Sequence, residues 1–214
     1  MYKILEKHKT YSLHLMVLIL GLTGVLGKLV SINAIHLVWY RMLIAFVVLA
    51  LFLLIKKQFF NIKIKDFIGI MGVGVLVTFH WIFFFEAIKV STVSIAVVCL
   101  ATSSLLSALI EPIFFKRNFL YYEVIMGLIV FASLAYMLDA DSNYFLGYVY
   151  GIISALLGTM FTIFNAKYIN KVGAAKITMI EMLTGVILIS LILVITGDYT
   201  VFKTKIALED FSYL

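Results

Sequence analysis

Seven runs of about 20 mostly apolar residues divide this chain of 214 residues, and they restrict its fold more than any other feature. They lie at 12–30, 34–55, 66–88, 91–115, 120–138, 146–168 and 174–197. A helix needs about 20 apolar residues to cross a bilayer, and lipid admits only helices and closed β-barrels because it offers backbone groups no partners. Barrel strands alternate over about 10 residues, so runs this long exclude a barrel. The sequence predicts an all-α, polytopic membrane protein with about seven transmembrane helices.

Composition agrees with this fold class. Hydrophobic residues make up 64% of the chain and charged residues 13%, whereas a soluble domain averages about 45–50% and about 25%. The net charge of +6 is spread over short loops between apolar runs, so we expect no nucleic-acid partner. The single cysteine, Cys99, excludes a disulfide framework. No small-x-small cleavage site follows the first run, which predicts a retained helix rather than a signal peptide.

Lysine and arginine residues predict the orientation, because they gather in cytoplasmic loops. Twelve of the 17 lie in alternate loops: Lys3, Lys7, Lys9, Lys56, Lys57, Lys63, Lys65, Lys116, Arg117, Lys167, Lys171 and Lys176. The opposite set of loops holds Lys89, Lys203 and Lys205. We therefore expect a multi-pass protein of the cytoplasmic (inner) membrane with a cytoplasmic N-terminus. This orientation is opposite to that of a seven-helix receptor.

A short internal repeat is present at an offset of 140 residues, where Arg41-Met42-Leu43 matches Glu181-Met182-Leu183. Transporters often contain such repeats, and a five-helix unit repeated once must be inverted. The repeat predicts a first five-helix unit over residues 1–138 and an incomplete second unit over residues 145–214. Ile206–Leu214 reads as the start of a further helix, so we expect three helices to be missing, in a truncated product or a fragment.

Polar residues are concentrated in Phe79–Arg117, which reads as a helical hairpin of the third and fourth helices. Within it, Phe85–Ala96 (FEAIKVSTVSIA) is similar to a corner of the form A-L-x-x-x-S-x-x-x-A in the EamA domains of the drug/metabolite transporter superfamily. Arg41 in the second helix and the basic end Glu111–Arg117 (EPIFFKR) add to the likeness. The succession of these features resembles that family over essentially all 214 residues.

The resemblance implies ten helices in two inverted five-helix halves that move small metabolites across the cytoplasmic membrane. One departure lies in the fourth helix, where many members have a proline and this chain has Ala101–Ser104. The larger departure is the absence of the last three helices, which close the cavity in such proteins. A homodimer, or another chain that supplies these helices, is therefore an expected partner besides the lipid bilayer and a small-molecule substrate.

Arg41, His80, Trp81 and Glu181 are the candidate substrate-binding residues. Arg41 lies about 10 Å below the outer end of its helix, where a charge costs several kcal/mol unless it faces a cavity or partner. The alternative is that Arg41 snorkels to the interface. His80 and Trp81 lie at a similar depth; the alternative there is a histidine bonded between helices beside a lipid-facing tryptophan. Glu181 lies equally deep in the seventh helix from the opposite face.

Two other acidic residues fit the membrane interfaces better than a binding site. Glu86 precedes Lys89 by three residues near the outer surface, which predicts a surface ion pair. Glu111 lies close to Arg117 at the cytoplasmic end of the fourth helix, where Pro112 is expected to kink the last turn. Neither residue is predicted to bind substrate.

The predicted function is transport of a small organic metabolite, an amino-acid-like or drug-like solute, by alternating access. The alternative is a truncated, non-transporting remnant or a membrane scaffold. The chain contains no H-E-x-x-H, no G-x-S-x-G and no phosphate-binding glycine loop, so we expect no enzyme, cofactor or metal.

Overall fold

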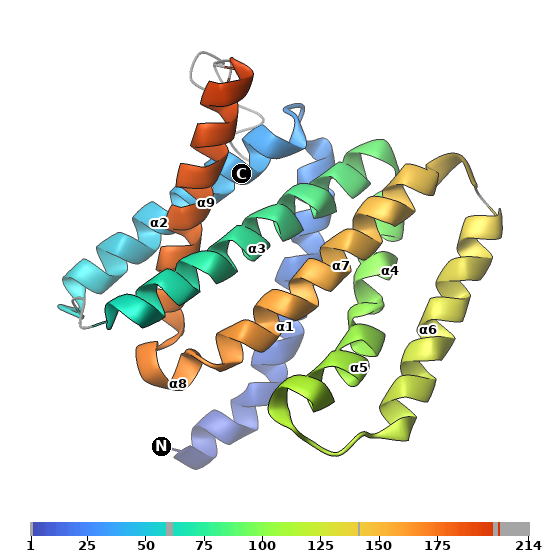
Figure 1. Ribbon diagram of the computed structural model, residues 1–214, viewed down its shortest axis with the longest axis horizontal. Helices are drawn as coiled ribbons and strands as arrows, with labels where there is room; N and C mark the ends of the chain where they lie inside the picture. The colour runs from blue at the N-terminus through green and yellow to red at the C-terminus, as the bar shows by residue number, and fades with distance from the viewer. Residues whose placement is uncertain (1, 59–61, 141, 199–200, 202–214) are drawn as a thin grey trace.

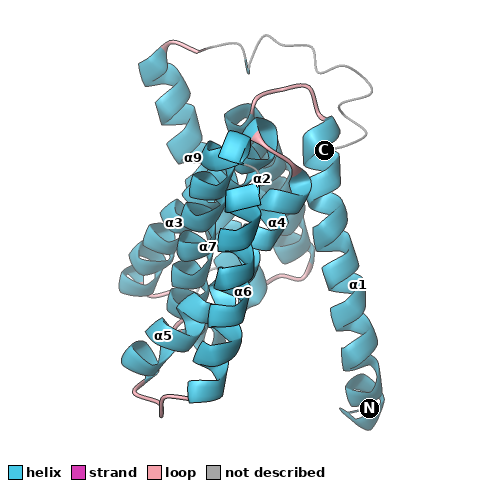
Figure 2. Cartoon of the chain, turned by 90° about the vertical axis from the view of Figure 1, so that its right-hand side faces the viewer, coloured by secondary structure: helices cyan, strands magenta, loops and turns pink. Residues whose placement is uncertain are grey.

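The computed structural model describes residues 2–58, 62–140, 142–198 and 201, and this part of the chain is helical with no strand (Figures 1 and 2). The helices are α1 Tyr2–Leu29, α2 Ala34–Ile55, α3 Ile64–Val90, α4 Val93–Ala101, α5 Ser103–Phe115, α6 Tyr121–Ala140, α7 Phe145–Ala166, α8 Ile169–Val172 and α9 Ala174–Thr196. A single 3-10 turn, Ser142–Tyr144, precedes α7.

The fold is all-α and multi-pass. Among the described residues, five helical stretches are long and apolar enough to cross a membrane: Ala34–Ile55, Ile64–Val90, Val93–Phe115, Phe145–Ala166 and Ala174–Thr196. Tyr121–Met137 is apolar but shorter. The run predicted at 12–30 overlaps the second half of α1 and ends one residue after it; α1 is not one of these five. The further helix predicted at 206–214 lies outside the described residues.

The fourth predicted helix is wrong in one respect, because the stretch 91–115 is divided into α4 and α5 at Thr102. Three consecutive hydroxyls bond back to carbonyls one turn earlier: Thr102 to Cys99 at 2.6 Å, Ser103 to Leu100, and Ser104 to Ala101 at 2.8 Å. Hydroxyls that bond back in this way bend helices. The break lies within Ala101–Ser104, the stretch that the sequence analysis gives as a departure from the similar proteins.

The central helix of the bundle is α3, which lies side by side with α7 in Figure 1 and also packs against α2, α4 and α9. Its buried side chains include Val77, Phe85 and Ile88, which belong to the largest apolar cluster. Glycines let the neighbouring helices approach closely. A Cβ added at Gly151 of α7 would lie 2.5 Å from the Cβ of Cys99 in α4, and a small residue at such a contact is typical of helix pairs in membranes.

Helices α2 and α9 pack against one another in opposite directions. The indole nitrogen of Trp39 donates to the hydroxyl of Ser190 at 2.9 Å. One end of the pair is fastened by the imidazole of His36, whose Nε2 lies 3.0 Å from a carboxylate oxygen of Asp198. This antiparallel pair brings the first turns of α2 to the last turns of α9.

Two lysines link the C-terminal ends of α1 and α3. The Lys28 ammonium donates to the carbonyls of Ile88 at 2.7 Å and Ser91 at 2.9 Å, and the Lys89 ammonium donates to the carbonyl of Val30. Each lysine thus satisfies carbonyls at the C-terminus of the other helix, the end that the helix dipole makes negative. The ammonium of Lys89 has further N–H donors, and the predicted Glu86–Lys89 ion pair stays a prediction.

The other end of the bundle carries an ion-pair network between α5 and α6. The guanidinium of Arg117 lies 3.2 Å from a carboxylate oxygen of Glu111 and 2.8 Å from one of Glu123. These bonds raise the pKa of Arg117, with the hydrogen bond to Glu123 as the largest cause. The predicted proximity of Glu111 and Arg117 is confirmed, and Glu123 is the partner that the sequence analysis did not find.

Candidate functional site

A cavity of about 190 Å³ lies between α2, α3 and α9, and the half-buried Arg41 is part of its lining. Its lining residues are Val38, Arg41, Met42, Ala45, Trp81, Phe85 and Met182. The four residues from α2 recur at intervals of three or four, so they share one face of that helix. Trp81 and Phe85 lie one turn apart on α3 and form the facing wall.

The cavity wall is built around the Arg41 guanidinium. Its central carbon lies 4.9 Å from the centre of the Phe85 ring, a cation–π distance. The Phe85 ring in turn stacks on Trp81, with ring centres 5.7 Å apart and planes inclined by 18°. The two aromatic rings and the cation therefore form a layered surface, with Arg41 half-buried over it. The structure brings Arg41 and Trp81 together, as predicted for a binding site.

His80 lies beside Trp81 in the sequence but faces a different helix. Its Nδ1 lies 2.8 Å from the backbone carbonyl and 3.0 Å from the hydroxyl of Ser154 in α7, and the same hydroxyl donates to the backbone carbonyl of His80. The ring is buried and packs edge-on against Phe161, with ring centres 5.3 Å apart. His80 therefore matches the alternative reading, a histidine bonded between helices, and does not line the cavity.

Glu181 also lies outside the cavity, although the next residue, Met182, lines it. The Glu181 side chain is 4% exposed and faces α7, where the Asn165 amide nitrogen donates to Oε1 at 2.7 Å. Its contact is therefore with Asn165 rather than with Arg41. Arg41 and Glu181 each lie seven residues after the first residue of α2 and of α9. Because these helices run antiparallel, the two side chains lie on opposite sides of the pair's middle.

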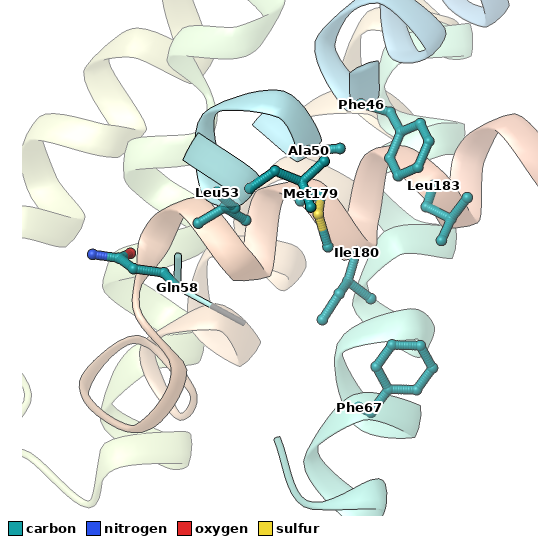
Figure 3. Close-up of a pocket in the computed structure, with 9 residues that line it drawn as sticks. Phe46, Ala50, Leu53, Gln58, Phe67, Met179, Ile180 and Leu183 are labelled. Carbon is teal, nitrogen blue, oxygen red and sulfur yellow. The ribbon is translucent and has the colours of Figure 1, made fainter. Parts of the chain in front are cut away.

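A larger cavity of about 470 Å³ lies between the last turns of α2 and the first turns of α3 and α9 (Figure 3). Phe46, Leu53, Phe67 and Met179 are among its lining residues, and Gln58 is the one polar residue in the lining. In Figure 3 the Gln58 amide points away from the apolar side chains. This space offers no charged group that could hold a polar solute, so the smaller cavity beside Arg41 is the better candidate for a binding site.

Sequence reasoning missed most of the apolar residues that shape the candidate site. Phe85 could have been found, because it lies one helical turn after Trp81. Val38, Met42 and Ala45 share the spacing of Arg41's face. Nothing in the sequence distinguished Met182 from the other apolar residues of its helix. The partners Ser154 and Asn165 were not predicted either, since pairing between distant helices is not encoded in local spacing.

The site is suited to binding rather than to covalent chemistry. Within the described ranges no three His, Cys, Asp or Glu side chains gather in a way that could hold a metal ion. The cavity supplies one cation, two large aromatic faces and apolar side chains. A few polar groups in an apolar hollow are typical of sites that recognise small molecules.

The comparisons with known proteins agree with this description. Residues 11–138 match a family described as the EamA-like transporter family, which is more than half of the chain. No curated relative and no solved structure matches the chain.

Proposed function

Because the chain belongs to the EamA-like transporter family, a family of membrane transporters and not of enzymes, we propose that it carries a small organic solute with an anionic group across the cytoplasmic membrane. The cavity between α2, α3 and α9 is the proposed binding site. The observation that carries the proposal is the Arg41 guanidinium, held against Phe85 in an otherwise apolar hollow. A cation at this depth is costly unless it has a function there.

The size of the cavity favours a small metabolite over a drug-like solute. Its volume is about 190 Å³, and sites for drug-sized ligands have volumes of about 300–1,000 Å³. A guanidinium recognises a carboxylate through two parallel hydrogen bonds. The Trp81 face can cover an apolar or aromatic side group of the same solute. An amino-acid-like carboxylate therefore fits this site better than an amphiphilic cation does.

Alternating access is supported by the arrangement of α2 and α9. They begin at Ala34 and Ala174, which is the offset of the proposed repeat. A Cβ added at Gly185 would contact the Met42 side chain, and Met182 lines the cavity together with Ala45. With the offset of 140 residues, Ala45 corresponds to Gly185 and Met42 corresponds to Met182. The contacts thus fit two inverted units, 1–138 and 145–214, that meet at the cavity and can rock about it.

The proposed orientation has the N-terminus in the cytoplasm. In Figure 1 the ends of α2, α5 and α7 lie at the same end of the bundle as the start of α1. These are the ends that carry most of the lysine and arginine residues. A homodimer, or a second chain that supplies further helices, remains a prediction. Neither His80 nor Glu181 lines the cavity, so the proposed binding site does not include them.

Uptake into proteoliposomes tests this proposal. The probes are a panel of radiolabelled amino acids, with an amphiphilic cation for comparison. We expect uptake of at least one carboxylate, and its loss in Arg41→Ala. Arg117→Ala is the matched control, because it removes the same side chain outside the cavity. Cation uptake that does not depend on Arg41 would overturn the proposed substrate class, and no uptake of any probe would favour the scaffold.

A further inference from the structure

We propose that Glu181 of α9 and Asn165 of α7 form a proton-binding site that is separate from the solute cavity and couples the carrier to protons. The inference rests on the proposed transport function. It assigns the buried carboxyl a ligand other than the substrate. The argument follows from burial, from hydrogen-bond donors and acceptors, and from the charged groups that surround the pair.

Burial is the first observation. The Glu181 side chain is 4% exposed inside an apolar bundle. Helix α3 closes over it at Gly74, where an added Cβ would lie 3.0 Å from the Glu181 Cα and 2.8 Å from the Thr184 Cβ. An ionised carboxylate without a counter-ion is strongly disfavoured in such surroundings, so the neutral acid is the form that fits.

Hydrogen bonding is the second observation. The Asn165 amide nitrogen donates to Oε1 of Glu181 at 2.7 Å, and this is the hydrogen bond that Glu181 makes in the structure. The amide oxygen of Asn165 is buried and has no hydrogen-bond partner. A carboxylate can only accept, so it leaves that oxygen unsatisfied. A protonated carboxyl has an O–H to donate, and Asn165 can then both donate to Glu181 and accept from it.

No cationic side chain on the surrounding helices neutralises Glu181 in place of a proton. The charged and titratable side chains on α2, α3, α7, α8 and α9, besides Glu181 itself, are His36, Tyr40, Arg41, Lys65, Asp66, His80, Glu86, Lys89, Tyr148, Tyr150, Lys171 and Lys176, with Lys167 directly after α7. None of them forms an ion pair or hydrogen bond with Glu181 in the part of the chain that the structure describes. Tyr168 lies close by, but its hydroxyl lies against Gly69 of α3. Glu181 therefore lacks a cation, and a proton is the ligand that neutralises it.

The position of the pair gives the proton a way to influence transport. Asn165 is the second-last residue of α7, and Glu181 lies in the first third of α9, so the hydrogen bond holds together the two proposed second-unit helices. Protonation favours the arrangement in which these helices are packed. Ionisation favours an arrangement in which water reaches the carboxylate. A ligand that binds the two arrangements differently shifts their populations, and here that ligand is a proton.

Infrared spectroscopy of the purified chain in nanodiscs tests the proton site without any substrate. We expect the carbonyl stretching band of a buried protonated carboxyl at neutral pH, and its loss in Glu181→Gln. Asn165→Leu should shift this band, because it removes the hydrogen bond to the acid. Glu86→Gln is the matched control and should leave the band intact. The same spectrum in wild type and Glu181→Gln overturns the proposal.

Transport provides the second measurement. Uptake of the amino-acid probe is compared between a pH gradient and solute exchange at equal pH on both sides. In wild type the gradient should accelerate uptake, and in Glu181→Gln the ratio of gradient-driven to exchange uptake should fall to unity. An unchanged ratio in Glu181→Gln contradicts the coupling role. If the wild type moves no probe at all, the proposed function fails, and the infrared band alone decides whether Glu181 holds the proton.

Discussion

The Arg41 guanidinium lies over the Phe85 ring at 4.9 Å, so a helix α2 cation is positioned by a helix α3 aromatic side chain. The same ring is stacked on Trp81. The Phe85 ring, which is itself packed against Trp81, therefore orients the Arg41 side chain. This orientation does not require a bound substrate.

Phe85→Leu should weaken substrate binding while keeping an apolar side chain in the cavity. A cation–π contact contributes about 0.5–2 kcal/mol, so we expect the apparent KM for uptake to rise about twofold to thirtyfold. The measurement is concentration-dependent uptake in proteoliposomes. Phe83→Leu is the control, because Phe83 packs against Tyr150 with ring centres 5.8 Å apart and does not line the cavity. An equal effect of both substitutions would contradict a special role for Phe85.

His80→Leu should reduce stability and leave KM unchanged. The substitution removes the bonds between His80 and Ser154, and a hydrogen bond between membrane helices contributes about 0.6 kcal/mol on average and up to about 1.7 kcal/mol. Ser154→Ala should cost less, because the Ser154 backbone carbonyl still bonds to the ring. Thermal unfolding in detergent gives the stability, and uptake gives KM. A rise in KM without loss of stability would instead assign His80 to the substrate.

Gly74→Ala should destabilise the contact between α3 and α9, whereas Gly72→Ala should not. A Cβ at Gly74 would lie 2.8 Å from the Cβ of Thr184, while a Cβ at Gly72 would meet nothing within 4 Å. Overpacking costs about 1–3 kcal/mol, and replacing glycine by alanine within a helix gains about 1 kcal/mol. Chemical or thermal unfolding of both variants measures the difference. Equal stability of the two variants would show that α3 and α9 are farther apart than described.

The break at Thr102 should disappear when its hydroxyls are removed. In the triple substitution Thr102→Ala, Ser103→Ala and Ser104→Ala, no side chain bonds back to the preceding turn, so we expect one straight helix. Spin labels at the exposed positions Val97 and Leu109, in a background that carries Cys99→Ala, report the bend. In a straight helix, 12 residues span about 18 Å, and the labelled wild-type sequence should give a shorter distance. Identical distances would assign the break to packing rather than to hydroxyls.

The apolar runs predicted where the helices lie along the chain because the bilayer itself sets their length. The prediction of 34–55 coincides with α2, and that of 66–88 differs from α3 by two residues at each end. The division at Thr102 was not predicted, since hydroxyls in an apolar run do not lower its hydrophobicity enough to interrupt it.

The sequence predicted how far along each helix the candidate residues lie, but it did not predict which neighbouring helix each side chain faces. Successive residues of a helix point about 100° apart, and an apolar background gives no sign of which direction faces which neighbour. Trp81 therefore lines the cavity while His80 faces α7, and Met182 lines it while Glu181 faces Asn165. Depth follows from counting residues from the helix end, whereas direction depends on packing between segments that are far apart in the sequence.

The two lysines that fasten α1 to α3 have a consequence for synthesis. The acceptors of the Lys28 ammonium, the carbonyls of Ile88 and Ser91, are made 60 and 63 residues after it. At about 5–20 residues per second, the ribosome needs roughly 3–13 seconds to reach them. During that interval the ammonium of a newly inserted first helix has only water and lipid headgroups to bind. The hydrogen bonds of Lys28 that link α1 to α3 can therefore form only after the third helix has been completed.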